Sequence, residues 1–137
     1  MLRFDKNNIK ELKELFYNSC VHDAKLKNVI YKYGKNSIKV ELFNPTFNIK
    51  IALIFHNVVI AFTIKGKAHG SQETIISLTA EEDFSYLQTY LPKCGECIQD
   101  DSLYLLFQMF SGDELHIVSK EVMVEINQSG DDSMIDN

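Results

Sequence analysis

The sequence is poor in cysteine and contains no tryptophan: its 137 residues include three cysteines, Cys20, Cys94 and Cys97. Three cysteines are too few, and odd in number, for the disulfide framework that holds many small secreted domains together. The first 16 residues are charged and amphipathic, and they lack the apolar stretch of a secretory signal. We therefore expect a cytoplasmic protein that folds without disulfides.

A long apolar run is also missing. The most apolar stretch, residues 51–64, is broken by His56, Asn57 and Thr63, whereas a membrane-spanning helix needs about 20 predominantly apolar residues. Hydrophobic residues nevertheless form 45% of the sequence, and a chain of this length can bury them in a core of its own. We expect a globular protein that has no membrane partner.

Positive charge is scarce, since the net charge is −5, and this argues against nucleic-acid binding, which needs a basic surface. Lys and Arg outnumber Asp and Glu by 12 to 5 in residues 1–67, whereas residues 68–137 hold 2 against 14. If these two parts separate in space, the acidic one could attract a basic protein partner. If strands from both parts interleave, the asymmetry averages out.

Two acidic clusters are the candidate contacts for such a partner. They consist of Glu81, Glu82, Asp83, Asp100 and Asp101. Carboxylates in such places also suit a helix start and a solvated loop, where they would have no partner at all.

Residues 47–64 show the clearest periodicity. Apolar residues occupy odd positions in the first part of this segment and even positions in the second, and alternation of this kind predicts strands with one buried face. A two-residue turn at His56-Asn57 explains the change of phase, because Asn tolerates positive φ, and it would place Leu53 opposite Ile60 on one face. The alternative is one long strand with a bulge at His56. We favour the hairpin, because most strands are only about 5–6 residues long.

In the rest of the chain, apolar residues show helical spacing in some segments and two-residue alternation in others. Helical spacing of apolar residues predicts a helix from about residue 5 to residue 19, and a Thr79-x-x-Glu82 capping box predicts a second, short helix that Pro92 ends. Alternation predicts further strands near residues 29–33, 38–42, 73–78, 103–109, 115–117 and 122–126.

Short links between these strands favour antiparallel pairing, because parallel strands need long crossovers. The predicted fold class is therefore α+β: a mainly antiparallel β-sheet, sandwich-like or curled, with an N-terminal helix and one further short helix. We expect a single globular domain over residues 1–126 and an acidic, disordered tail over residues 127–137. An edge strand of this sheet could also form a homodimer.

The Cys94-x-x-Cys97 pair is the sharpest chemical signal. A zinc site would need two more donors, which Cys20 and His22 could supply. A redox role is disfavoured, because the pair follows a helix and stands among carboxylates that raise a thiol pKa. The alternatives are a zinc-binding or small-ligand module that uses these four residues and two ordinary thiols in a loop.

Recognisable catalytic constellations are missing. No pair of the four histidines has the i, i+4 spacing of a helical metal site, and the sequence contains neither a phosphate-cradling glycine loop nor a nucleophile elbow. His22 could act as a general base oriented by Asp23, or the two side chains could simply bond to each other. We predict a non-enzymatic protein without a cofactor.

Four segments carry a resemblance to known proteins: Leu15-Phe16 with His22-Asp23, Phe55-His56-Asn57-Val58, His69-Gly70-Ser71 with Ile75, and the run from Ser111 to Ile117. They resemble small bacterial proteins of unknown function, some of which look like immunity proteins of contact-dependent or polymorphic toxin systems. The third segment resembles a Trp-Gly-x-Ser-x-x-Ile pattern without its tryptophan and with the serine one position early. The resemblance implies a toxin-neutralising protein and no catalytic residue.

Overall fold

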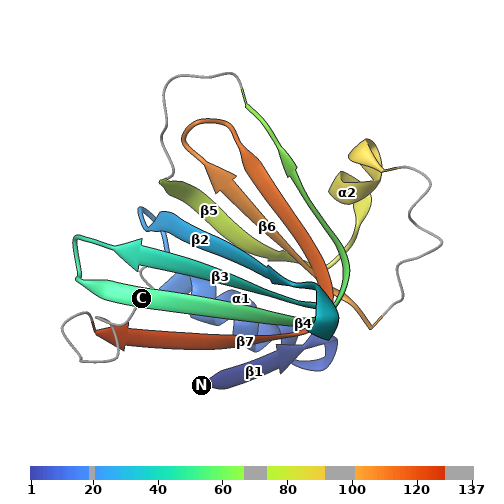
Figure 1. Cartoon of the computed structure of the whole chain (residues 1–137), viewed down its shortest axis with the longest axis horizontal. Helices are drawn as coiled ribbons and strands as arrows, with labels where there is room; N and C mark the ends of the chain where they lie inside the picture. Colours follow the sequence, from blue (N-terminus) through green and yellow to red (C-terminus); the bar gives the residue numbers. More distant parts are fainter. Residues whose placement is uncertain (19–20, 67–73, 92–100, 129–137) are drawn as a thin grey trace.

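The computed structural model describes residues 1–18, 21–66, 74–91 and 101–128. In these residues seven strands form one sheet in which every pairing is antiparallel, joined by one longer and one short helix (Figure 1). The elements in chain order are β1 (Leu2–Asp5), the 3-10 turn η1 (Lys6–Asn8), α1 (Ile9–Asn18), β2 (Lys25–Lys32), the 3-10 turn η2 (Tyr33–Lys35), β3 (Ser37–Asn44), β4 (Ile49–Ile64), β5 (Ile75–Glu81), α2 (Ser85–Tyr90), β6 (Leu103–Met109) and β7 (Glu114–Gln128). The predicted α+β class is confirmed.

The strands follow the order β2-β3-β4-β7-β6-β5, with β1 also beside β7. β4 and β7 are long, and both turn at the same corner of the molecule (Figure 1). The first half of β4 (49–56) and the second half of β7 (121–128) lie with β1, β2 and β3, and we call this the five-stranded half. The remaining halves, 58–64 of β4 and 114–119 of β7, form a four-stranded half with β5 and β6.

The sheet curls so far that its two end strands touch. The Asp23 N–H donates to the Ile75 carbonyl at 3.0 Å, and the Ile75 N–H donates to the Ala24 carbonyl at 2.8 Å. A bridge between Lys25 and Thr74 extends this contact. The predicted curled form is therefore the observed one, and it encloses a core between the two halves of the sheet.

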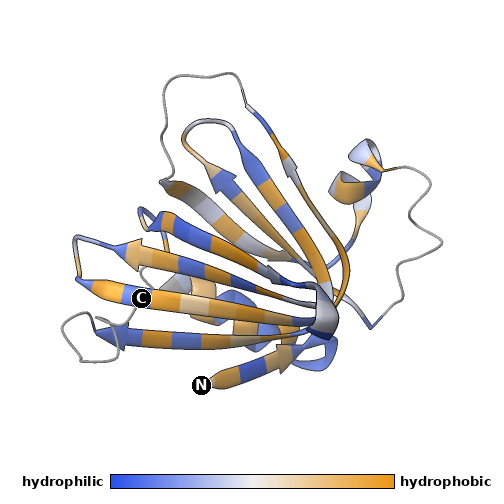
Figure 2. Cartoon of the chain, viewed as in Figure 1, coloured by the Kyte–Doolittle hydropathy of each residue, from blue (hydrophilic) through white to orange (hydrophobic). Residues whose placement is uncertain are grey.

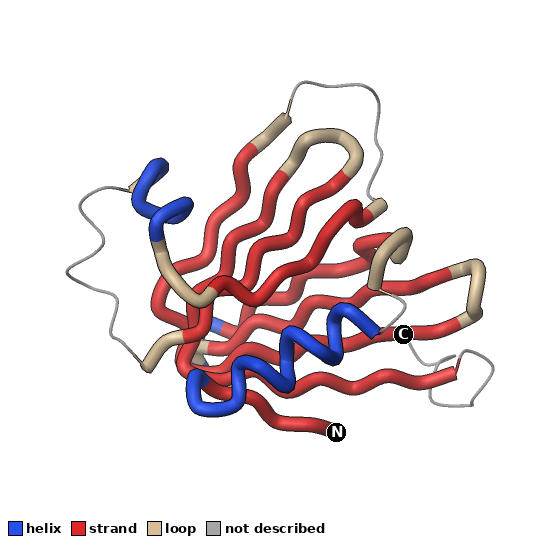
Figure 3. Tube along the Cα trace, turned by 180° about the vertical axis from the view of Figure 1, so that it is seen from behind, coloured by secondary structure: helices blue, strands red, loops and turns tan. Residues whose placement is uncertain are grey.

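This core is built from the residues that alternation and helical spacing single out. Apolar residues recur at every second position of the strands (Figure 2). α1 lies across the sheet (Figure 3) and buries Ile9, Leu12 and Phe16 against it, as the predicted stripe requires. None of the described helices is long and apolar enough to span a membrane.

The hairpin predicted at His56-Asn57 is wrong, because β4 runs through this pair as one strand. Asn57 does have positive φ, 53°. It bends the strand without reversing it, since a two-residue turn of type I′ needs positive φ at both turn residues. The long bulged strand is the correct alternative, and its bulge lies between Val58 and Ile60.

Leu53 and Ile60 consequently do not share a face. Leu53 is fully buried in the main core. Ile60 packs in a second cluster, with Val118 and with Leu87 of α2, on the opposite face of the sheet, which we call the outer face. The physical reason lies in β7, which is 15 residues long and stays paired with β4 on both sides of the bend. By staying with β7, the second half of β4 keeps hydrogen bonds along one edge, while the first half pairs with β3 as well.

Three smaller predictions also need correction. The helix predicted from residue 5 begins as η1, which Asp5 caps, and is preceded by β1, a strand too short to show periodicity. Thr79 is a strand residue paired with Leu106, so it caps no helix. The two strands expected at the end of the chain are one strand, β7, which continues to Gln128 and so past the predicted domain limit. The predicted tail beyond it lies outside the described residues.

Candidate functional site

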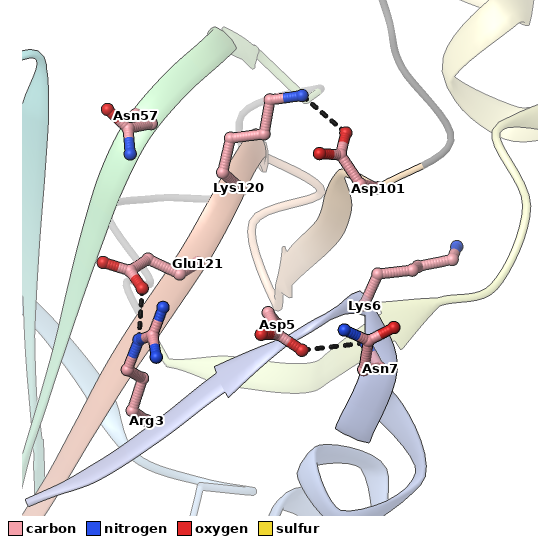
Figure 4. A pocket seen from close by; sticks show the side chains of 8 residues that line it. All are labelled: Arg3, Asp5, Lys6, Asn7, Asn57, Asp101, Lys120 and Glu121. Atoms are coloured by element: carbon pink, nitrogen blue, oxygen red, sulfur yellow. Dashed lines mark hydrogen bonds and ion pairs between the residues drawn. The ribbon is translucent and has the colours of Figure 1, made fainter.

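A cleft forms where two strands diverge. β1 and β6 pair with the same edge of β7, on either side of Lys120. The gap between them is a cleft of about 480 Å³ (Figure 4), which we call the polar cleft. Its lining side chains are polar or charged without exception: Arg3, Asp5, Lys6, Asn7, Asn57, Asp101, Lys120 and Glu121.

The charged side chains of the polar cleft mostly pair with other groups of the protein itself. The Arg3 guanidinium donates to the Glu121 carboxylate, and the Lys120 ammonium pairs with Asp101 (Figure 4). Lys6 donates to the Glu82 carbonyl at 3.0 Å and lies over the ring of Phe84. Three cations therefore face three carboxylates, so the cleft attracts neither anions nor cations strongly.

The cleft also lacks a group prepared for acid–base chemistry. The hydrogen bond from Lys120 holds the pKa of Asp101 below its usual value, so this carboxyl is ionised at neutral pH. Asp5 accepts from the Asn7 N–H at 2.8 Å as part of the η1 cap. An ionised carboxylate such as that of Asp101 is a poor general acid.

A second polar cluster is buried beneath α2, on the outer face of the four-stranded half. His116 has no exposed surface. Its Nδ1 lies 2.7 Å from the Tyr104 hydroxyl, and its Nε2 lies 2.9 Å from Oε1 of Glu114. Tyr86 of α2 donates to the other oxygen of Glu114 at 2.7 Å. The ring of Phe62 stacks on the imidazole with 4.4 Å between centroids.

This cluster joins α2 to the sheet and is closed to substrates. Burial, then the charges of Glu81 and Glu114, raise the pKa of Tyr104. The hydrogen bond to Glu114 raises the pKa of Tyr86. Both phenols therefore remain protonated donors at neutral pH. Because His116 and Tyr104 are fully buried, the cluster serves stability.

The second half of β4 has one unpaired edge. β7 pairs with one side of this segment, whereas on the other side only Val58 bonds to a described neighbour, Asn36. Residues 59–64, Val-Ile-Ala-Phe-Thr-Ile, have no strand beside them in the described part of the chain. We call this segment the open edge.

Hydrogen-bond alternation identifies the backbone groups that the open edge presents. The Met109 N–H donates to the Asp113 carbonyl at 3.0 Å, so odd-numbered residues of β7 bond to β6 and even-numbered ones bond to β4. Their partners in β4 are even-numbered too. We infer that the N–H and C=O groups of Ala61 and Thr63 point away from β7 and into the unpaired side.

A small groove begins at the same place. It has a volume of about 220 Å³ and lies between η2 and the start of the open edge. Its lining includes Tyr31 and Tyr33, whose rings stack with 5.9 Å between centroids. Tyr33 is 88% exposed. Sequence reasoning missed this site, although the uncharged run over residues 58–64 was a signal for it.

Of the four predicted zinc ligands, only His22 lies among the described residues. Cys20, Cys94 and Cys97 lie outside the described residues. His22 is exposed, and its Nδ1 lies 3.2 Å from a carboxylate oxygen of Asp23, as one of the two sequence alternatives supposed. No group of three or more potential metal ligands occurs among the described residues, and the zinc site stays a prediction.

The predicted acidic contacts are divided between two places. Glu81 ends β5, Glu82 pairs with Lys13 at 3.3 Å, and the Asp83 carboxylate accepts from the N–H of Ser85, the first residue of α2, at 3.0 Å. Asp101 lies in the polar cleft, and Asp100 falls outside the described residues. The strands of the two parts of the chain largely form separate blocks in the sheet, β2-β3-β4 from residues 1–67 and β7-β6-β5 from residues 68–137, and only the second half of β7 lies between strands of the first part, β4 and β1.

Comparison with known proteins gives no family. No protein-family model matches the sequence, and a search of the curated proteins found no significant match.

Proposed function

We propose that this is a non-enzymatic binding protein that binds an extended segment of another protein along the open edge. One observation supports the proposal most directly: residues 59–64 form an edge without a described partner strand and without a charged side chain. An added strand would bond to the backbone groups of Ala61 and Thr63, which is the mode of recognition known as β-strand addition.

The composition of the open edge supports a binding role over a merely structural one. Soluble proteins usually protect their edges with lysine, proline or very short strands, because an unprotected edge recruits other chains. β2 follows this rule with Lys25, Lys27 and Lys32, and β1 is only four residues long. The open edge has neither form of protection over six residues.

The neighbouring tyrosines add a second element that suits a protein interface. Tyrosine is enriched among the residues that contribute most to binding, because its rigid ring covers a large area at a small cost in conformational entropy. Tyr31 and Tyr33 are both exposed and already stacked on each other. They need little rearrangement to cover a segment that lies in the groove.

The resemblance to immunity-type proteins suggests a more specific form of the proposal. In that form the protein is bacterial, its partner is a toxin, and the chain neutralises the toxin by holding one of its segments against the open edge. The same partner could also contact the carboxylates of Glu81, Glu82 and Asp83, as the sequence-based expectation of a basic partner requires.

A pair of variants at Thr63 tests the proposal. Thr63→Pro removes the N–H that faces the partner, and an edge strand tolerates proline on its unpaired side. Thr63→Ala keeps the N–H and is the matched control. The immobilised chain is used to capture its partner from an extract of the cells it comes from, and the partner is then purified and titrated calorimetrically.

We expect the wild type and Thr63→Ala to bind this partner alike, and Thr63→Pro to bind it about tenfold more weakly, the effect of one lost hydrogen bond. Circular dichroism melts of the three proteins establish that each is folded. If no partner is captured, or if Thr63→Pro binds it as tightly as the wild type, the open edge is not the interface.

A further inference from the structure

The chemistry around the groove indicates what kind of segment the open edge accepts, an inference that rests on the proposed function. Two exposed lysines, Lys32 and Lys35, flank Tyr33 in η2. Lys32 lines the groove together with both tyrosines and with Val59. A segment that enters the groove therefore meets Lys32, and Lys35 lies three positions further along the chain, at the end of η2.

These two lysines have no counterion among the described residues. The ion pairs of the described chain leave both of them out. Lys65, at the other end of the open edge, differs, since it lies 3.6 Å from the Asp113 carboxylate. Uncompensated positive charge is thus concentrated at the end of the open edge where the groove lies.

We propose that the bound segment is an extended peptide with an uncharged, apolar stretch and with aspartate or glutamate at the end beside Lys32 and Lys35. The apolar stretch lies along Ile60, Phe62 and Ile64, of which Ile60 and Phe62 also pack against the cluster beneath α2. The carboxylates meet the two lysines. Complementary charge at one end also determines the orientation of the bound segment along the open edge.

The same charges disfavour a second copy of the chain as the occupant. In a symmetric antiparallel pairing centred on residues 61 to 63, Lys65 of the second copy comes to lie beside residues 57–61. Val59 and Lys32 line the same groove there, so Lys65 would arrive near Lys32 together with the Asp113 carboxylate 3.6 Å from it. This ion pair brings no net negative charge to Lys32 and Lys35, whereas an acidic segment does.

Selection from a peptide library tests the inference on the whole folded chain. The probe is a phage-displayed library of random dodecapeptides, and the selected sequences are synthesised and titrated. The test variant is Lys32→Glu/Lys35→Glu. The matched control is Lys25→Glu/Lys27→Glu, which changes the net charge equally at the other, exposed end of β2.

We expect selected peptides to carry acidic residues at one end of an apolar stretch and to slow amide exchange at Ala61 and Thr63. Their affinity should fall about tenfold in Lys32→Glu/Lys35→Glu and change less than about twofold in the control. Selection of basic or uncharged peptides, equal losses in both variants, or the absence of any enriched peptide would each overturn the inference.

Two further results separate this inference from the proposed function. Acidic peptides that depend on Lys32 and Lys35 but bind Thr63→Pro unchanged would leave the lysines as a binding site and remove the open edge from it. Uncharged peptides that bind the wild type and not Thr63→Pro would keep the open edge and overturn the acidic chemistry. A chain that sediments as a dimer, and as a monomer when Thr63 is proline, would make a second copy the occupant and overturn the inference.

Discussion

Tyr104 and His116 are hydrogen-bonded to each other beneath α2, where both are buried. The tyrosine hydroxyl lies 2.7 Å from Nδ1 of the imidazole. Glu114 lies 2.9 Å from the other ring nitrogen, and its carboxylate can only accept. Nε2 therefore carries a proton, and in the neutral imidazole Nδ1 accepts the hydrogen bond from Tyr104. The pair ties β6 to β7 at the point where α2 covers the sheet, and its hydrogen bonds can be tested one at a time.

Tyr104→Phe removes the donor to Nδ1 and leaves a buried acceptor without a partner. We expect this change to lower the free energy of unfolding by about 1–3 kcal/mol. Urea denaturation followed by circular dichroism measures it. The control is Tyr17→Phe, which removes the same hydroxyl from a side chain that is 89% exposed and should cost less than about 0.5 kcal/mol. Equal losses in the two variants would contradict the role given to Tyr104.

Glu114 should make stability fall in acid. Burial raises its pKa, but hydrogen bonds from Tyr86, His116 and Gln108 outweigh burial and hold the pKa of Glu114 below its usual value of 4.5. A folded-state pKa below the unfolded one contributes stability above about pH 4.5, and this contribution is lost as the pH falls through the folded-state value.

Urea midpoints of the wild type and Glu114→Gln, measured from pH 7 to pH 3, test this dependence. The pKa values of Asp83, Asp101 and Asp113 are also lowered, so both proteins lose stability in acid. We expect Glu114→Gln to lose less, because one titrating group is gone. Parallel curves for the two proteins would show that Glu114 contributes nothing to the slope.

Asn57 should be replaceable by glycine and not by alanine. Its φ of 53° lies in the left-handed region, where a residue with a Cβ pays roughly 1–2 kcal/mol unless it is Asn or Asp. We expect Asn57→Ala to destabilise the fold by about 1 kcal/mol more than Asn57→Gly does. Thermal and urea unfolding of both variants measure the difference. Alanine and glycine of equal stability would mean that β4 bends without help from this position.

Gly66 lies against the backbone of the turn between β6 and β7. A Cβ at this position would lie 2.6 Å from the Cα of Gly112 and from the carbonyl oxygen of Ser111. Neither backbone atom can move without disturbing the turn, so we expect Gly66→Ala to cost about 1–3 kcal/mol.

Gly34→Ala is the control for Gly66→Ala, because a Cβ at Gly34 meets nothing within 4 Å. It should change stability by less than about 0.5 kcal/mol. Urea denaturation of both variants gives the comparison, and a Gly66→Ala protein as stable as Gly34→Ala would contradict the close approach.

Local patterns predicted those elements whose periodicity is complete within one segment. Ile9, Leu12 and Phe16 form a helical stripe, and they do face the core. Alternation from Leu103 to Met109 likewise predicted β6. The spacing within each segment was enough to identify the element, although β6 proves to be buried on both faces, with Tyr104 and Leu106 beneath α2.

The change of phase in β4 is different, because it has two solutions that satisfy the local pattern equally well. A turn at His56-Asn57 would put these apolar residues on one face, whereas a continuous, bent strand sends Leu53 to the main core and Ile60 to the cluster beneath α2, so that each half buries a different face. What distinguishes them is the presence of a 15-residue partner, β7, which is more than fifty residues away in the sequence. The burial of His116 and the isolation of the open edge follow from that same pairing.

The amino-acid sequence by itself determined the α+β class, the antiparallel pairing and most of the side chains that enter the core, because these depend on spacing along short segments. Only the tertiary structure decided that β4 continues through Asn57, that the sheet curls until β5 touches the start of β2, and that one edge of residues 59–64 stays unpaired. Each of these depends on which distant strand lies alongside. Hydrogen bonds between distant strands make that choice, and periodicity within one segment does not encode it.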